Sequence, residues 1–160
     1  MYFEQSEDER ESMRSRRIKF VIDSDLENVF LISMTIRNLC SLVSLSDMEI
    51  DQVELCLVEA VNNSIEHAYG KQKGHNVEVV VYLSRERLMI EVCDMGKAMD
   101  ESRLEGIDPS FRNMDLDDLD SIPEEGRGLP IIKTIMDSVF YKVQNGRNCF
   151  TMIKSIRQKV

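Results

Sequence analysis

The sequence lacks the long apolar runs that would place the chain in a membrane. No stretch approaches the roughly 20 consecutive apolar residues of a spanning helix. The opening segment, MYFEQSEDERESMRSRR, holds no apolar signal region. We therefore expect neither a membrane protein nor a secreted one, and the sequence predicts a cytoplasmic location.

Basic residues and histidine are also scarce. Twenty Lys and Arg residues stand against 29 Asp and Glu residues, which gives a net charge of −9. A surface of this sign repels phosphate backbones, so nucleic-acid binding is not expected as the main role. The cysteines are Cys40, Cys56, Cys93 and Cys149. They form no CxxC pair, and the chain contains only two histidines, so a zinc site is not expected. This cysteine usage favours four free thiols in a reducing cytosol.

The remaining composition is that of one globular domain. A chain of 160 residues is too short for two ordinary domains, and 42% hydrophobic with 31% charged residues is typical of a folded protein. Residues 1–16 are polar and are interpreted as a flexible tail. This leaves residues 17–160 as the folded domain.

Hydrophobic periodicity predicts a strand and two helices in the first half of the chain. Residues 17–22 alternate as a strand does. Capping boxes at Ser24 with Glu27 and at Ser46 with Glu49 open helices that extend to about residues 44 and 69. Gly70 follows the second helix, where a glycine cap belongs.

The second half predicts two antiparallel hairpins and a long loop. Residues 77–83 and 88–92 alternate, and two further strands flank the turn signal Asn145-Gly146, after a helix at about 129–137. Residues 97–125 show no periodicity, and a loop of this length is usually a lid or a binding loop. The fold class expected is α+β, a two-layer sandwich of a mostly antiparallel sheet with helices on one face.

Three clusters of residues carry chemistry. On the second long helix, Glu59, Asn63 and His67 are spaced four apart and form one stripe. An Asn amide oxygen can ligate magnesium, and a carboxylate one turn earlier can accept a proton beside it. A polar face that pairs with neighbouring elements would explain the stripe equally well.

The second and third clusters are glycine-containing loops. Asp94 stands at the end of a predicted strand and is followed by Gly96. The carboxylate can accept a hydrogen bond from an exocyclic amine, and the glycine permits a ring to approach the backbone closely. The segment from Glu125 through Gly126, Arg127 and Gly128 precedes a helix. Backbone amides there can hold phosphate oxygens. A simple turn and a simple hinge are the alternatives.

The order and spacing of these clusters resemble the GHKL ATPase superfamily (the Bergerat ATP-binding fold). Within it, the sequence is most similar to the anti-sigma-factor serine/threonine kinases of the RsbW and SpoIIAB type. Residues 59–69 match the box E-A-V-x-N-x-x-x-H-A-Y, residues 94–100 match D-x-G-x-x-[FM]-D, and residues 126–137 match G-R-G-L-x-I-I-x-x-x-M-D.

This resemblance implies a role for each matching residue. Glu59 corresponds to the general base, Asn63 to the Mg²⁺ ligand and Asp94 to the residue that reads the adenine amino group, with Gly96 beside the ring. The end of the ATP lid, which wraps the triphosphate, corresponds to Gly126, Arg127, Gly128 and Leu129. The implied cofactors are ATP and Mg²⁺.

The resemblance also implies partners. Such kinases phosphorylate a Ser or Thr of a STAS-domain anti-anti-sigma protein and sequester a sigma factor, usually as homodimers. A binding module that sequesters its partner without phosphorylating it is the alternative, and the presence of Glu59 favours the kinase. A histidine kinase fits poorly, because no separate phosphoacceptor hairpin is expected. The acidic run at 115–120 is interpreted as a solvated lid surface, with contact to a basic partner as the alternative.

Three positions depart from the family pattern. Ala98 occupies the place of a second glycine in the strand-end box. Asn148 and Cys149 stand where the late strand often carries Thr-Thr, whose hydroxyl supports adenine binding. A thiol is a poor hydrogen-bond donor, so these departures bear on nucleotide affinity rather than on the fold.

Overall fold

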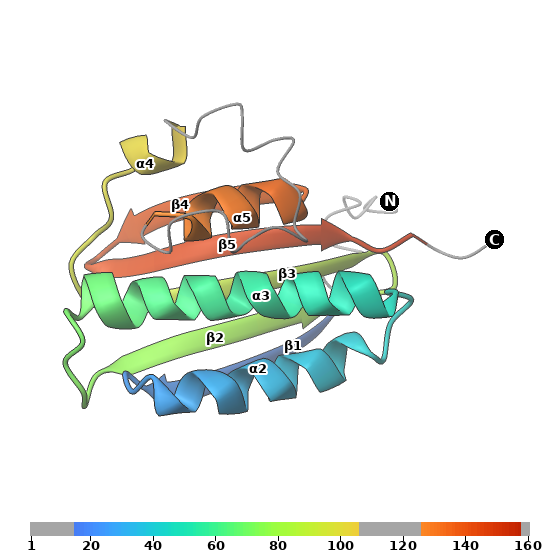
Figure 1. Cartoon of the computed structure of the whole chain (residues 1–160), viewed down its shortest axis with the longest axis horizontal. Coiled ribbons are helices and arrows are strands. Elements are labelled where there is room, and N and C mark those ends of the chain that lie inside the picture. The colour runs from blue at the N-terminus through green and yellow to red at the C-terminus, as the bar shows by residue number, and fades with distance from the viewer. Residues whose placement is uncertain (1–14, 106–125, 158–160) are drawn as a thin grey trace, which may run out of the picture.

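The computed structural model describes residues 15–105 and 126–157 as a five-stranded antiparallel sheet covered by helices. The strands are β1 (Arg16–Asp23), β2 (Asn76–Leu83), β3 (Arg87–Asp94), β4 (Ser138–Gln144) and β5 (Arg147–Ser155), in the spatial order β1-β2-β3-β5-β4. Figure 1 shows the sheet crossed by helices α2 (Glu27–Cys40) and α3 (Asp47–Asn63). The predicted α+β class and antiparallel sheet are confirmed.

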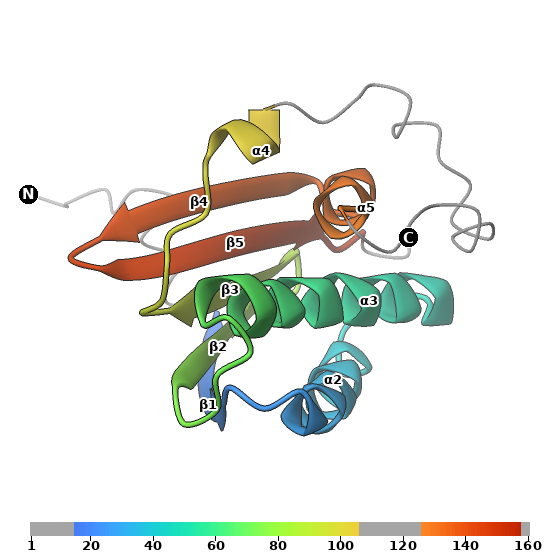
Figure 2. The same ribbon diagram turned by 60° about the vertical axis from the view of Figure 1, so that its left-hand side comes forward.

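The helices lie side by side on one face of the sheet. Helix α3 packs between α2 and α5 (Gly128–Ile135), and Figure 2 shows the three helices together beside the strands. Alternate residues of β2 and β3 face them and are fully buried, including Val79, Val81, Ile90 and Val92. The apolar side of α3 completes the core with Val53, Leu57 and Val61. Among the described residues, none of the helices combines the length and apolar character needed to span a membrane.

One of the two predicted capping boxes is present. Ser46 Oγ accepts from the Glu49 amide at 3.3 Å, and the Ser46 amide donates to Glu49 Oε2 at 2.8 Å. The box predicted at Ser24 is wrong, because α2 begins at Glu27 without a side-chain cap. Ser24 is buried, and its hydroxyl instead donates to the Gln72 carbonyl at 2.6 Å and so ties two loops together.

The predicted boundaries differ from the observed ones at several places. β1 begins at Arg16, inside the segment expected to be a tail. α2 ends at Cys40 rather than near Ser44. The predicted lid is not wholly irregular, because a short helix, α4 (Ser102–Glu105), lies within it. Residues 1–14 and 106–125, which include the acidic run and Glu125, lie outside the described residues.

The second long helix changes type before it ends. After Asn63 the chain continues as one turn of π-helix, η1 (Ser64–Ala68), in which the Tyr69 amide donates to the Ser64 carbonyl at 3.0 Å. Gly70 then takes a left-handed φ of 58°, as its predicted capping role requires. The prediction of one uniform helix to Tyr69 therefore placed the element correctly but missed the inserted residue.

The expectation of four free thiols is wrong. Cys93 on β3 and Cys149 on β5 form a disulfide with a Cα–Cα distance of 4.2 Å, while Cys40 and Cys56 are free and buried. The two bonded residues lie 56 positions apart in the sequence but face each other in the β3–β5 register. Spacing along the chain could not reveal the pair, because the pairing of β3 with β5 creates it.

Candidate nucleotide-binding site

A cavity of about 360 Å³ opens between the end of α3, η1 and the ends of β3 and β5. Its apolar walls include Val92, Met99 and Phe150, which suit a flat ring. Two cations, Lys97 and Arg103, also line it. Two carboxylates, Asp94 and Asp100, line it as well, so the cavity presents both cationic and anionic groups to a ligand.

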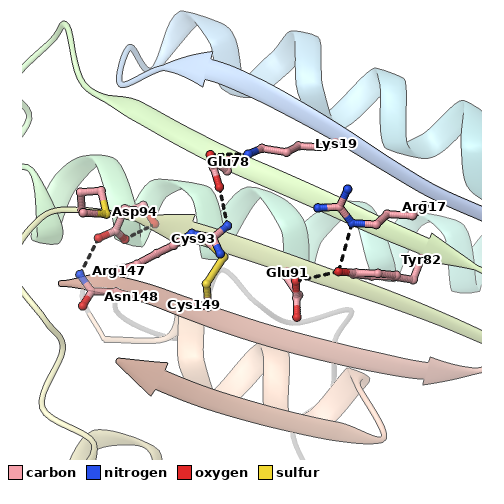
Figure 3. Close-up of a disulfide and its surroundings, with 12 residues drawn as sticks. Arg17, Lys19, Glu78, Tyr82, Glu91, Cys93, Asp94, Arg147, Asn148 and Cys149 are labelled. Atoms are coloured by element: carbon pink, nitrogen blue, oxygen red, sulfur yellow. Dashed lines mark hydrogen bonds and ion pairs between the residues drawn. A yellow bond between two sulfur atoms is a disulfide. The ribbon is translucent and has the colours of Figure 1, made fainter. Parts of the chain in front are cut away.

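Asp94 lies in this cavity and is held by three donors. Its Oδ2 accepts from Ser64 Oγ at 2.8 Å, and its Oδ1 accepts from the Gly96 amide at 3.0 Å and from Asn148 Nδ2 at 2.8 Å. Figure 3 shows the Asn148 amide nitrogen directed at the carboxylate. A carboxylate has about four acceptor positions, so one remains for a ligand amine such as that of adenine.

Ser64, the first residue of η1, contacts Asp94. Its amide still donates to the Ala60 carbonyl as in a regular α-helix, and its hydroxyl is directed at Asp94 Oδ2. The π-bulge acts on the residues that follow, because an inserted residue rotates all later residues about the helix axis, and such bulges occur frequently at functional sites. It also ends the predicted stripe: Glu59 and Asn63 lie on regular helix and are half-buried, whereas His67 lies beyond the start of the bulge and is exposed at the cavity.

Gly96 is required by its contact with η1. A Cβ atom on Gly96 would stand 2.4 Å from the Ala68 carbonyl oxygen, and the next amide, that of Lys97, donates to the same oxygen at 2.9 Å. The close neighbour of Gly96 is thus the protein's own backbone, and the predicted approach of a ligand ring to Gly96 stays a prediction. This contact fixes the loop after β3 against the end of η1.

Glu59 lies against the start of α5 and is not among the residues that line the cavity, although the next residue, Ala60, is. A Cβ atom on Gly128 would stand 2.6 Å from Glu59 Oε2. Burial raises the pKa of the Glu59 carboxyl above its ordinary value, and the Arg127 cation opposes this rise. A carboxylate with a raised pKa is better suited to accept a proton near neutral pH.

The glycine-rich segment is placed in part as the sequence suggests. Gly126 takes a left-handed φ of 86°, and α5 begins two residues later, with Pro130 in its first turn. Leu129 is buried in the hydrophobic core, so its side chain anchors the helix. Of the predicted site residues, Asn63 and Asp94 line the cavity, whereas Glu59 and Gly128 contact each other and are not part of its lining.

Sequence reasoning missed several residues of this site. Tyr141 on β4 lines the cavity, and its hydroxyl accepts from the Met99 amide at 2.8 Å, which secures the first part of the predicted lid. Arg103 on α4 and Phe150 on β5 also line the cavity. Strand alternation could have placed Phe150 on the helix-covered face. No sequence signal marked Tyr141 or Arg103.

Asn148 has a definite part in the site, although it departs from the family pattern. Its side chain is buried, and besides Asp94 Oδ1 it donates to the Gly96 carbonyl at 3.0 Å. The amide thus supplies the donor that a threonine hydroxyl would supply. Cys149, the other departure, lies partly exposed and bonded to Cys93.

The comparisons with known proteins identify the family of the chain. Residues 22–154 match the histidine kinase-like ATPase domain family. The chain is 30% identical over 121 residues to the serine-protein kinase RsbW of Bacillus licheniformis, which covers 75% of this chain and 74% of that protein. It is 28% identical over 129 residues to RsbW of Bacillus subtilis (strain 168), covering 80% and 78%.

A solved structure shares the fold. A chain of the SiaB–SiaC complex from Pseudomonas aeruginosa superimposes with a TM-score of 0.55 at 17% identity, covering 97% of this chain and 100% of that one. At this identity the likeness concerns the fold alone. The five-stranded sheet and its helices are therefore an arrangement that an experimental structure also contains.

Proposed function

Because the chain belongs to the histidine kinase-like ATPase family, in the branch of the serine-protein kinases, we propose that it uses ATP and Mg²⁺ to phosphorylate a STAS-domain anti-anti-sigma protein. We further propose that it sequesters a sigma factor, acts as a homodimer and works in the cytoplasm. Phosphorylation would then switch the kinase between its two partners. The resemblance to anti-sigma-factor kinases supports these finer assignments.

The lining of the cavity supports adenine as the ring bound there. Asp94 has an acceptor position free for the exocyclic amine, while Phe150 and Val92 offer apolar contact to the ring faces. Lys97 and Arg103 line the same cavity and can contact phosphate groups. These features favour a purine nucleotide over a small anion, because a small anion would gain no hydrogen bond from the buried carboxylate.

The donors in the described residues also fit Mg²⁺ bound mainly through the nucleotide. No group of three or more His, Cys, Asp or Glu side chains gathers as a cation site within residues 15–105 and 126–157. Magnesium usually keeps several waters and takes phosphate oxygens with one or two protein ligands. Asn63, half-buried and lining the cavity, would be such a ligand. The bound ion would neutralise charge on the transferring phosphoryl group.

The observation that carries the kinase proposal is the position of Glu59. Its carboxylate lies one helical turn before Asn63, half-buried, with a pKa raised by burial. We assign Glu59 the role of general base. It accepts the proton of the substrate serine or threonine hydroxyl as the hydroxyl oxygen attacks the γ-phosphate. A module that only sequesters its partner needs no base there.

The test is transfer of the γ-phosphate from labelled ATP to STAS-domain proteins of the source organism. The variant Glu59→Gln should bind nucleotide and fail to transfer. Asp47→Asn, which removes an exposed carboxylate from the same helix α3, is the matched control and should transfer normally. Nucleotide binding without transfer to any candidate would favour the sequestering module, and transfer by Glu59→Gln at the wild-type rate would remove Glu59 as the base.

A further inference from the structure

The Cys93–Cys149 disulfide lies next to the residues that hold the cavity carboxylate. Cys93 precedes Asp94 on β3, and Cys149 follows Asn148 on β5. In the register of the two strands, Cys93 faces Cys149 and Asp94 faces Asn148. Figure 3 shows the sulfur bridge and the Asp94–Asn148 hydrogen bond on neighbouring rungs of one ladder.

The two rungs point to opposite faces of the sheet. Successive side chains of a strand alternate between faces, so Asp94 and Asn148 lie toward the cavity while the cysteines lie on the face that α2, α3 and α5 leave uncovered. A ligand in the cavity therefore does not touch the disulfide. The disulfide acts on the cavity only through the spacing of β3 and β5, which it restrains at a Cα–Cα distance of 4.2 Å.

The two cysteines differ in their exposure to solvent. Cys149 is partly exposed, whereas Cys93 is fully buried. Lys142 of β4 stands opposite Cys149, and Glu78 of β2, which is paired with Arg147, stands opposite Cys93. Because Cys149 is the more exposed residue of the pair, exchange at its sulfur is the accessible route.

The other two cysteines do not compete in this chemistry. Cys40 and Cys56 are buried in the core between helices and sheet. Burial raises the pKa of Cys40 to about 11 and that of Cys56 to about 12. Both therefore stay protonated at neutral pH, and the protonated thiol is the inert form.

We propose that Cys93 and Cys149 form a redox modification site at which low-molecular-weight thiols and disulfides exchange, and that the bond state of this pair sets the nucleotide affinity of the cavity. The inference rests on the proposed function, because it takes the cavity to be the adenine site. The disulfide holds Asn148 against Asp94 and so preorganises the carboxylate. Reduction removes this covalent restraint between β3 and β5, which loosens the contact of Asn148 with Asp94 and weakens nucleotide binding.

The exchange balances with a small disulfide such as oxidised glutathione as the oxidant. The Cys149 thiolate attacks one sulfur of the small disulfide, a mixed disulfide forms, and one small thiolate leaves. The Cys93 thiolate then attacks the Cys149 sulfur, the internal disulfide forms, and the second small thiolate leaves. The two protons from the protein thiols pass to the two released thiolates. Two small thiols reverse both steps.

The experiment has two separate readouts on the full chain. Equilibration in glutathione buffers of graded ratio, followed by denaturing alkylation, should show two modified cysteines when the pair is oxidised and all four when it is reduced. ADP affinity is then measured by calorimetry in both states. We expect reduction to weaken ADP binding roughly fivefold, the change that one loosened hydrogen bond produces.

Two variants serve as controls. Cys149→Ser cannot form the bond and should bind ADP like the reduced wild type under both conditions. Cys56→Ala retains the pair and should respond to reduction as the wild type does. Four alkylated cysteines even in strongly oxidising buffer would overturn the redox site. Equal ADP affinity in both states would overturn the coupling alone, whereas no ADP binding in either state would overturn the nucleotide assignment and the coupling with it.

Discussion

Gly128, the first residue of α5, lies so close to Glu59 on α3 that a Cβ atom on the glycine would stand 2.6 Å from the carboxylate oxygen Oε2. The two residues are far apart in the sequence and belong to different predicted motifs. Their contact leaves no room for a side chain at position 128 while Glu59 keeps this position, although Gly128 has no left-handed backbone angle. The start of α5 fixes one side of the space in which the Glu59 side chain lies.

This contact predicts the effect of Gly128→Ala. The added methyl meets the end of a flexible side chain, so Glu59 can turn away at small cost to folding. Displacing a general base removes most of its contribution, about 10²- to 10⁴-fold in rate. We expect phosphoryl transfer to fall by at least tenfold, with ADP affinity and melting temperature nearly unchanged, measured by kinetics, calorimetry and thermal unfolding.

Gly74→Ala is the contrasting variant for this experiment. Gly74 has a φ of 85° with no atom near its Cβ position, so alanine there strains the backbone without crowding a neighbour. It should lower the melting temperature and leave the transfer rate intact. Normal transfer by Gly128→Ala would show that the contact with Glu59 does not control catalysis.

Burial of Glu59 predicts a pH dependence of stability. Because its pKa is raised in the folded state, the folded chain keeps this proton at pH values where the unfolded chain, with a pKa of about 4.3, has lost it. Between those two values stability falls as pH rises. Glu59→Gln should therefore unfold at a higher temperature than wild type at pH 7, and the difference should vanish near pH 4.

The same shift should appear in the kinetics. The transfer rate should fall on acidification with a midpoint above the ordinary range of a glutamate, since protonated Glu59 cannot accept the substrate proton. Glu66→Gln should retain this acid limb but move it to a lower pH, because the Glu66 charge contributes to the raised pKa of Glu59. A limb at the position of an unperturbed carboxyl would contradict the assignment of Glu59 as the half-buried base.

The hydrogen bond from Asn148 to Asp94 predicts a graded effect on nucleotide binding. Threonine at position 148 retains a donor, whereas valine of the same shape has none. A hydrogen bond to a charged group is worth about 1.5 to 3 kcal/mol, so Asn148→Val should weaken ADP binding by about tenfold or more. Asn148→Thr should lose much less, as calorimetry can measure. Equal losses in the two variants would show that shape, and not the donor, matters at this position.

The sequence predicted elements better than the contacts between them. The second capping box and the strands of both hairpins follow from local patterns, and the structure contains them. The box at Ser24 matched the same pattern but was wrong, because Ser24 is buried and its hydroxyl satisfies the Gln72 carbonyl from a distant loop. A local motif cannot show that a tertiary partner competes for the side chain.

The candidate site was predictable only where its residues stand in motifs. Asn63 and Asp94 were identified, and both line the cavity. The donors that hold Asp94 were not, because Ser64 meets it through the packing of η1 on β3, and Asn148 through the pairing of β3 with β5. Helix packing and strand order are decided by the whole domain.

Asn63 offers a test of the metal assignment. If its amide oxygen ligates Mg²⁺ bound to the nucleotide, Asn63→Ala should reduce the gain in ATP affinity that magnesium provides and leave metal-free binding nearly unchanged. Calorimetry with magnesium and with a chelator separates the two quantities. Asn62→Ala, one residue earlier and outside the lining of the cavity, is the matched control. An undiminished magnesium effect in Asn63→Ala would remove this residue from the metal site.

Among the site residues, we expect substitution of Gly96 by alanine to have the largest structural effect. A Cβ atom there would stand 2.4 Å from the backbone oxygen of Ala68, and backbone cannot turn aside as the Glu59 side chain can. Gly96→Ala must therefore push the loop after β3 off η1 and break the bond from the Lys97 amide to the same oxygen. Overpacking of this kind costs about 1 to 3 kcal/mol. We expect a lower unfolding free energy in urea together with loss of ADP binding, because Asp94 is held partly by the Gly96 amide.

Gly70→Ala separates backbone strain from crowding, since the φ of Gly70 is 58° and no atom lies near its Cβ position. That variant should lose stability while binding ADP normally. Normal ADP binding by Gly96→Ala would show that the cavity does not depend on the contact between Gly96 and Ala68.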